Sequence, residues 1–207
     1  MVRARMTVLA LAAFAVVPVA SRPLRAAIWE IDPAHTAIQF SVRHMMVSNV
    51  HGTFAKFSGH VDGDQATPTA ARIEATIDAA SIDTANQKRD EHLRSPDFLD
   101  VAKFPTITFK SKKLENAGEA KWKVTGDLTL HGVTREVLLD VSDVAPPIKD
   151  PMGNMRAGAE ARTTINRQDF GVSFHKTLDG GGVIVGDAIA ITIDVEVTKK
   201  SDAAPGR

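Results

Sequence analysis

The feature that most constrains the fold is a hydrophobic period of two, which runs through most of the chain after residue 27. The cleanest run lies near the C-terminus, where β-branched residues alternate with smaller or polar ones: Ile189, Ile191, Ile193, Val195 and Val197. Alternation of this kind is typical of a β-strand with one buried and one solvated face. Shorter runs of the same type begin near residues 38, 71, 107 and 137. The pattern predicts roughly eight half-buried antiparallel strands.

Turn-forming residues separate these runs. Gly, Asn, Asp and Pro gather between them, at residues 62–64, 116–118, 131–132, 146–147, 152–154 and 179–182. Such residues supply a positive or fixed φ where an antiparallel chain reverses. A long antiparallel sheet closes most simply into a barrel, because closure removes its unpaired edges. We therefore expect an all-β domain in which about eight strands form a barrel.

One segment departs from the alternation. Residues 84–95 are polar and suit a helix, with Thr84 as a candidate N-cap and Pro96 ending the run. We expect a short helix near one mouth of the barrel. The charged residues of this segment, from Arg89 to Arg94, form either an acid–base cluster or a solvated helix face. We favour the solvated face, because such charges are usual on exposed helices.

The first 27 residues have the pattern of an export signal. Arg3 and Arg5 form a basic start, and a run of 14 residues without a charge follows at 6–19. This run is shorter than the ~20 residues that span a bilayer as a helix. Small residues come next, and Ser21 and Ala26 place the cut within 21–27. The alternative is an uncleaved membrane anchor.

Composition and charge narrow the remaining choices. Without residues 1–27 the chain has 21 basic and 25 acidic residues, so its net charge is mildly negative. We expect one domain over residues 28–199, a flexible tail over 200–207, a periplasmic location and no stable membrane insertion. The charge balance argues against a nucleic-acid partner held by phosphate contacts. The chain has no Cys, which excludes disulfides, thiolate metal sites and Cys nucleophiles.

Four histidines invite a metal interpretation: His35, His44, His51 and His60. Their spacings of 9, 7 and 9 residues are odd, so consecutive members point to opposite faces of an uninterrupted strand. The sequence has no tight H-x-H or H-E-x-x-H pair, and no G-x-S-x-G nucleophile motif. We therefore predict no metal site, no catalytic residue and no enzymatic activity.

The run at 71–79 bears on whether the barrel is filled or hollow. Its inward positions alternate small residues with Ile: Ala71, Ile73, Ala75, Ile77 and Ala79. A barrel of about eight strands is either just filled by its own side chains or encloses one ligand. The residues alone leave both alternatives open. A hollow barrel would have an apolar lining and would take a lipid-like ligand.

Eight blocks of sequence occur in the order and spacing of a known family. They are DPAHT (32–36), FSVRH (40–44), VHGTF (50–54), FSG (57–59), SPDFLDV (95–101), KFPTITF (103–109), GDLTLHGVT (126–134) and INRQDFG (165–171). In these blocks the chain resembles the YceI-like family of bacterial exported proteins, over about residues 29–199. The resemblance implies a lipocalin-like, extended antiparallel barrel with a long apolar pocket and a periplasmic location. It also implies an isoprenoid chain or a similar amphiphile as the ligand.

The resemblance suggests a carrier with no cofactor, whose ligand is an isoprenoid, a quinone-like molecule or a fatty-acid-like molecule. The family is not established as enzymatic. Two alternatives are a lipid-modifying enzyme and a stress-related structural protein with a filled barrel. Antiparallel sheet edges also allow a homodimer. One departure from the family is Met45-Met46, where relatives commonly have Leu-Gly; we expect this pair to add bulk near one end of the pocket.

We predict a pocket lined by apolar residues on strand-like faces. They are Phe40, Val42, Phe54, Ile73, Ala75, Ile77, Phe109, Trp122, Leu130, Phe170 and Phe174. His44 shares the parity of Phe40 and Val42 and so faces inward as well. Either it binds a ligand head group or it is a core histidine bonded to the backbone, and we favour the second. The alternative for several apolar residues is that they close the ends of the barrel.

Overall fold

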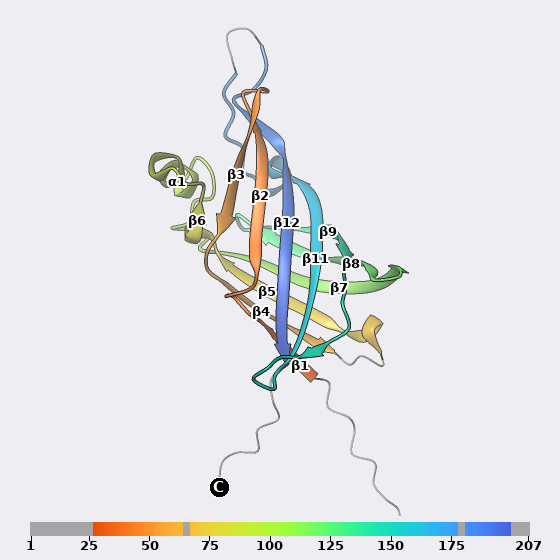
Figure 1. The fold of residues 1–207 in the computed structure, drawn as a ribbon. Helices are drawn as coiled ribbons and strands as arrows, with labels where there is room; N and C mark the ends of the chain where they lie inside the picture. Colours follow the sequence, from red (N-terminus) through yellow and green to blue (C-terminus); the bar gives the residue numbers. More distant parts are fainter. Residues whose placement is uncertain (1–26, 64–66, 178–180, 200–207) are drawn as a thin grey trace, which may run out of the picture.

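The structure, a computed structural model, describes residues 27–63, 67–177 and 181–199. These residues form one antiparallel sheet in which eight strands close into a barrel (Figure 1). In order around the ring, the strands are β1 (Ala27–Ile31), β4 (Phe57–Gly63), β5 (Arg72–Asp78), β7 (Thr106–Gly118), β8 (Lys121–Leu130), β9 (Val133–Ser142), β11 (Met155–Asn166) and β12 (Val185–Lys199). β12 closes the ring because it pairs with both β11 and β1. The predicted eight-stranded antiparallel barrel is confirmed.

Shorter strands extend the sheet beyond the ring. β2 (Ala37–His44), β3 (Ser48–Phe54) and β6 (Ile82–Asp83) continue outward from β12. β10 (Ile148–Lys149) forms a small hairpin with β11. β1 and β2 lie along the same edge of β12, β1 at its C-terminal end and β2 along its N-terminal part. The two strands thus act as one long strand that is interrupted at residues 32–36.

Cross-strand pairing shows which residues share the inner face. Ile165 on β11 is opposite Ile189 on β12, and Ala161 is opposite Ile193. Residues directly opposite each other in a sheet point to the same side. The odd-numbered apolar residues of β12 therefore face inward together with those of β11. This is the face that the alternation of the sequence selects.

A packed core lies at one end of the barrel. Its buried members are Ala79, Ile107, Leu130, Ile165 and Phe170. The 3₁₀ helix η3 (Arg167–Phe170) directly follows β11 and places Phe170 among the strand residues. We refer to this group as the end core.

The predicted short helix is present as α1 (Gln87–Arg94) and lies beside β6. Its N-cap is Asn86, whose Oδ1 accepts from the backbone N of Arg89 at 3.1 Å, so Thr84 was the wrong cap. Thr84 instead donates both its backbone N and its Oγ1 to Asp90 Oδ1. Asp90 is 6% exposed, so a fully solvated helix face was also wrong. The helix is anchored by buried hydrogen bonds rather than by an apolar stripe.

Other 3₁₀ turns are η1 (Pro68–Ala70) and η2 (Ala79–Ser81), which flank β5. Among the described residues, no helix has the length and apolarity needed to cross a membrane. The expected signal segment, residues 1–27, lies outside the described residues except for Ala27, which begins β1, and the expected tail at 200–207 lies outside them entirely. Both stay predictions.

Candidate functional site

The inner face of the barrel is the first candidate site, and β5 shows how it is built. Ala75 is opposite Gly59 on β4 and opposite Phe109 on β7. Ile73 and Ile77 share this face: Ile73 is opposite Val61 on β4, and Ile77 is opposite Phe57 on β4 and Ile107 on β7. All three are half-buried, whereas the intervening Arg72, Glu74 and Thr76 are exposed. The strand register therefore places Ile73, Ala75 and Ile77 on the inner face, as the sequence predicted.

The inner face carries little charge. Within the described barrel strands, the charged residues of inward parity are Arg135, Asp187 and Lys199. Arg135 is exposed and donates from Nε to the backbone O of Asp169, beside the end core. Asp187 accepts from Arg167 at 2.7 Å. The charged residues thus lie towards the ends of the strands, and most inward residues between them are apolar or small.

Two inward aromatic rings lie over glycines of neighbouring strands. A Cβ built on Gly126 would be 2.5 Å from the Cζ of Phe109, and one built on Gly52 would be 2.3 Å from the Cζ of Phe40. Such distances are shorter than real contacts, so each ring occupies the place of the missing side chain. The rings therefore pack along the wall. Gly126 and Gly52 are each buried by this arrangement.

Burial along the inner face is uneven. Besides the members of the end core, the buried inward apolar side chains of the described ring strands are those of Trp29, Val124 and Ala161, but many other inward apolar residues away from the end core are only partly buried. They include Ile31, Val61, Ile73, Ala75, Phe109, Leu139, Val141, Ala157, Ala159, Ile193, Val195 and Val197. These partly buried residues are the ones that a ligand inside the ring could contact.

The predicted lining residues separate into two groups. Leu130 and Phe170 belong to the end core, and Phe54 and Ile77 pack against it. Phe174 lies outside the strands, with its ring centroid 4.6 Å from that of Phe98. Leu130 and Phe170, with Phe54 and Ile77 packed against them, help to close one end of the barrel, which the sequence left as an alternative. Of the other predicted residues, Ile73, Ala75, Phe109 and Trp122 are half-buried on the inner face of ring strands. Phe40, Val42 and His44 are half-buried on β2, beyond the ring, where Phe40 and Val42 are opposite the inward Ile191 and Ile189 of β12.

His44 ends β2, opposite Ser48 on β3 and Val185 on β12. It is half-buried and shares a face with Val42 and Phe40, as its parity predicted. Met45 and Met46, which follow it, lie in an exposed turn between β2 and β3. The expectation that this pair adds bulk near one end of the pocket was wrong, because both side chains are exposed at the end of a hairpin that lies beyond the ring.

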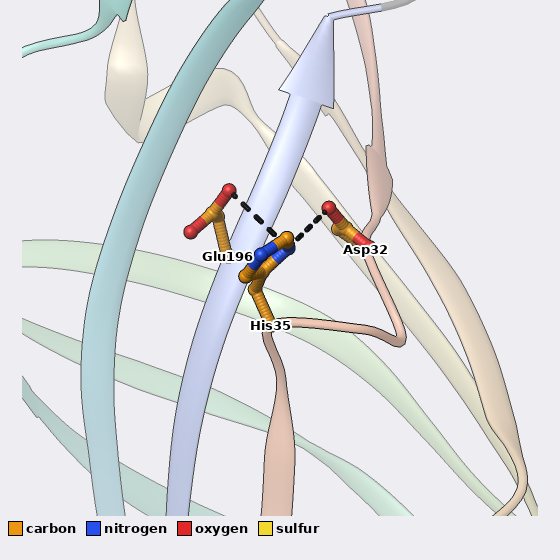
Figure 2. A group of neighbouring side chains, drawn as sticks. All are labelled: Asp32, His35 and Glu196. Carbon is orange, nitrogen blue, oxygen red and sulfur yellow. Dashed lines mark hydrogen bonds and ion pairs between the residues drawn. The ribbon is translucent and has the colours of Figure 1, made fainter. Parts of the chain in front are cut away.

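A network of charged side chains lies where β1 gives way to β2, on the outside of the barrel. Arg156 on β11 is its centre: Nη1 donates to Asp32 Oδ2 at 2.8 Å and to Glu196 Oε1 at 2.5 Å. Its Nε donates to Asp150 Oδ2 at 2.7 Å. His35 Nδ1 lies 2.9 Å from Asp32 Oδ2 and 4.0 Å from Glu196 Oε1 (Figure 2). We call these five residues the arginine network.

The arginine network shifts the titration of its members. Hydrogen bonds from His35 and Arg156 lower the pKa of Asp32 from 3.8 to about 2. The Arg156 hydrogen bond lowers the pKa of Asp150 from 3.8 to about 2 as well. In return, Asp150, Asp32 and Glu196 raise the pKa of Arg156. A backbone hydrogen bond also joins the interrupted strand to β12 here, since Asp32 N donates to Glu196 O at 2.9 Å. The network therefore holds the interrupted strand against β12.

Asp32, His35 and Glu196 also offer three ligand atoms within 4.8 Å of one another, close enough for one metal ion. The same oxygens, Asp32 Oδ2 and Glu196 Oε1, already accept from Arg156. A divalent cation would have to displace a guanidinium that is bound by three carboxylates. The arrangement fits a structural ion network better than a metal site. The other candidate histidines do not join this group.

Arg167 is a buried polar residue that sequence reasoning missed. It is 3% exposed and donates to Val172 O at 2.6 Å, Gly186 O at 3.0 Å and Asp187 Oδ1 at 2.7 Å. These bonds tie η3 to the start of β12 and so fix the end core. Its place in the INRQDFG block was the only signal in the sequence.

Two grooves lie on the outer side of the sheet. One, of about 610 Å³, is lined mainly by outward residues of β2, β3 and β12, including Gln39, His51 and Thr192. The other, of about 580 Å³, runs over β1, β4 and β5 beside Glu30, His60 and Glu74. Both are mixed in polarity and open to solvent. Of the residues predicted to line a pocket, Phe40 lines part of the first groove and Ala75 lines part of the second.

These features define a class of protein: a closed antiparallel barrel with an apolar, largely uncharged inner face and one packed end. The chain belongs to the YceI-like domain family, which matches residues 29–197. The resemblance found in the sequence is thereby confirmed.

Individual relatives agree with this assignment. A UPF0312 protein of Ectopseudomonas mendocina (strain ymp) is 40% identical over 139 residues, which cover 67% of this chain and 72% of that protein. The crystal structure of Burkholderia cenocepacia BcnA is 27% identical, with a TM-score of 0.69, covering 80% of this chain and 98% of that one. A polyisoprenoid-binding domain from Saccharophagus degradans shares the fold, with a TM-score of 0.61, 14% identity, and coverage of 84% and 99%.

Proposed function

We propose that this protein is a carrier that holds an isoprenoid or a similar long-chain amphiphile inside the barrel and performs no chemistry on it. The observation that carries the proposal is the partial exposure of the apolar inner face away from the end core. A ligand chain lying against Ile73, Ala75 and Ile193 would remove this surface from water. Burial of apolar surface is the main driving force for such binding.

The chemistry of the wall selects the chemistry of the ligand. Along most of the inner face there is no charged side chain to recognise an anion or a cation, so the part of the ligand inside the barrel is a hydrocarbon. A ligand of about forty heavy atoms at roughly −0.3 kcal/mol per atom would bind with about −12 kcal/mol. That free energy corresponds to a Kd of order nanomolar without any charged anchor.

The position of the rings supports a long, narrow ligand. Because Phe109 and Phe40 lie over glycines, they add apolar surface without projecting across the barrel. The end core stops the chain at one end, so pocket length is a natural determinant of specificity. The description of the S. degradans relative as a polyisoprenoid-binding domain supports the same ligand class.

We further propose that the protein acts in the periplasm. The support is the basic start, the short apolar run and the small residues of the N-terminal segment. Fractionation of the producing bacterium tests this, since the protein should leave the cell with the periplasmic fraction and be shorter than the full chain. Recovery of the full-length chain with the membranes would instead support an uncleaved anchor.

Organic extraction and mass spectrometry of the purified protein test the carrier function. We expect about one long-chain amphiphile per protein molecule. Recovery of no amphiphile, together with failure to take up added isoprenoid, would support a filled barrel instead. Conversion of an added isoprenoid into a new product would support the enzyme alternative.

A further inference from the structure

The β2–β3 hairpin ends in three consecutive apolar residues that lie outside the barrel. Met45, Met46 and Val47 are 40%, 56% and 75% exposed. They form the end of the orange hairpin near the top of Figure 1. We call these three residues the hairpin tip. Exposed apolar residues that are contiguous often mark an interaction surface.

The backbone of the tip gives no reason for methionine. Val47 N donates to His44 O at 3.0 Å, which closes a turn around Met45 and Met46. Their φ angles are 48° and 61°, the two positive values of a type I′ turn. Such turns strongly prefer Asn-Gly or Asp-Gly, because residues with side chains are strained at positive φ. Neither the conformation of this turn nor its exposure to solvent therefore favours methionine at positions 45 and 46.

The tip is held in position. Met45 N donates to Ile184 O at 2.8 Å, in the segment that precedes β12. Arg43 Nη2 donates to Met46 O at 2.8 Å, and its Nη1 lies 3.4 Å from Asn49 Oδ1. Because the turn is already ordered, docking it against a partner would cost little conformational entropy.

The charges around the tip are positive. In the described residues 43–49, 174–177 and 181–185, the Lys, Arg, Asp and Glu side chains are Arg43 and Lys176. The backbone O of Lys176 accepts from Ile184 N at 3.0 Å, in the segment that supports the tip, and its Nζ lies 5.8 Å from the centroid of the Phe174 ring. An apolar group flanked by cations fits the boundary of an anionic lipid bilayer, where acyl chains take the apolar side chains and head groups take the charges.

We propose that the hairpin tip docks the protein on the surface of an anionic phospholipid membrane. Met45, Met46 and Val47 enter the boundary between head groups and acyl chains, and Arg43 and Lys176 contact the phosphates. A convex tip of three side chains suits a fluid lipid surface better than a large protein interface. This inference goes beyond the carrier function and does not require a lipid inside the barrel.

Flotation of the protein with vesicles tests the proposal. The vesicles contain equal parts of phosphatidylcholine and phosphatidylglycerol, and vesicles of phosphatidylcholine alone serve for comparison. We expect the parent protein to float with the mixed vesicles more than with the neutral ones. The variant M45N/M46G should bind the mixed vesicles about tenfold less, because it removes two apolar side chains from the contact.

The variant is chosen so that loss of binding does not reflect loss of the fold. Asn-Gly is the preferred pair for a type I′ turn, so the thermal midpoint of M45N/M46G should equal or exceed that of the parent. Met152→Ser is the matched control, because Met152 is 78% exposed near β10, at the opposite end of β12. We expect it to bind vesicles like the parent.

Four results would overturn the proposal. They are failure of the parent to float, unchanged flotation of M45N/M46G, an equal loss in Met152→Ser, and equal binding to neutral vesicles. A dimer that M45N/M46G converts into a monomer, without vesicle binding, would instead assign the tip to contact between two copies. Amphiphile content, measured on the same samples, reports separately on the carrier function.

Discussion

Phe109 on β7 covers Gly126 on β8 so closely that a Cβ at position 126 would lie 2.5 Å from the ring. The pairing matters because Phe109 is opposite Ala75, the smallest inward residue of β5. The large side chain of Phe109 thus lies over Gly126 on one neighbouring strand and is opposite the small Ala75 on the other. Side chains in this part of the barrel therefore project little towards its axis, as the proposed binding of a long chain inside the barrel requires.

Replacing Ala75 with Phe should block the barrel. The new ring would project from β5 beside Phe109, where the wall is now thin, so bound amphiphile should fall well below one per molecule. Overpacking costs typically about 1–3 kcal/mol, so the protein should still fold. Extraction with mass spectrometry and a urea titration measure the two effects. Thr76→Phe is the control, because Thr76 is the adjacent outward and exposed residue. Full amphiphile content in Ala75→Phe would mean that this wall does not line the site.

The arginine network predicts how stability depends on pH. Asp32 and Asp150 have pKa values of about 2 in the folded protein against 3.8 ordinarily, so the folded state favours the carboxylates. Their contribution is therefore complete above the unfolded pKa of 3.8 and is lost as pH falls through about 2. Removing Arg156 takes away the largest cause of the lowered pKa of Asp150 and, after the His35 hydrogen bond, the second largest cause of the lowered pKa of Asp32. The stability difference between the parent and Arg156→Met should consequently shrink as pH falls from 5 towards 2.

Chemical denaturation at several pH values measures this difference. Arg162→Met is a suitable control, since Arg162 is on the same strand and pairs with Glu160 at the surface. Its effect should be small throughout. A stability difference for Arg156→Met that is constant across the acid range would show that the network does not hold the two carboxylates ionised.

Asp90 should be important for stability although it lies on a polar helix. Its Oδ1 accepts from Thr84 N at 2.9 Å and from Thr84 Oγ1 at 2.5 Å, and both residues are buried. Asp90→Ala leaves those donors without an acceptor, which should lower the free energy of unfolding by about 2 kcal/mol. Glu91→Ala, one residue further and exposed, should change it by less than about 0.5 kcal/mol. Equal effects of the two substitutions would contradict the anchoring role of Asp90.

Arg167 should stabilise the end core. Its guanidinium satisfies the backbone oxygens of Val172 and Gly186 and the carboxylate of Asp187. Arg167→Met fills similar volume but leaves these acceptors unpaired, so we expect a loss of about 3 kcal/mol in the free energy of unfolding. Thermal or urea denaturation measures it. Arg135→Met, which removes an exposed arginine near the same 3₁₀ helix, should cost far less.

Much of this fold could be predicted from the sequence because strand alternation is a local signal. The runs at 71–79 and 189–197 fixed which side chains face inward, and the parity of His44 placed it on the same face as Val42. The helix at 84–95 was also predicted, because its polarity and the following Pro96 are local. These features depend on a few neighbouring residues and need no knowledge of the fold.

The rest depended on contacts between distant parts of the chain. Asp32 and Arg156 are 124 residues apart, and no pattern in the sequence links them. Similarly, Phe170 looks like any other inward aromatic until η3 places it among Ala79, Ile107 and Leu130. The turn at Met45-Met46 was misplaced because parity gives the direction of a side chain but not the residue at which a hairpin ends.

The most direct test of the central claim is an NMR measurement of contacts between bound isoprenoid and isoleucine methyl groups. Loaded protein with labelled Ile methyls should show nuclear Overhauser effects from the ligand chain to Ile31, Ile73 and Ile193, which face inward away from the end core. The outward and exposed Ile28 and Ile148 should show none. Contacts to Ile28 or Ile148 without contacts to the inward methyls would place the ligand outside the barrel and contradict the account.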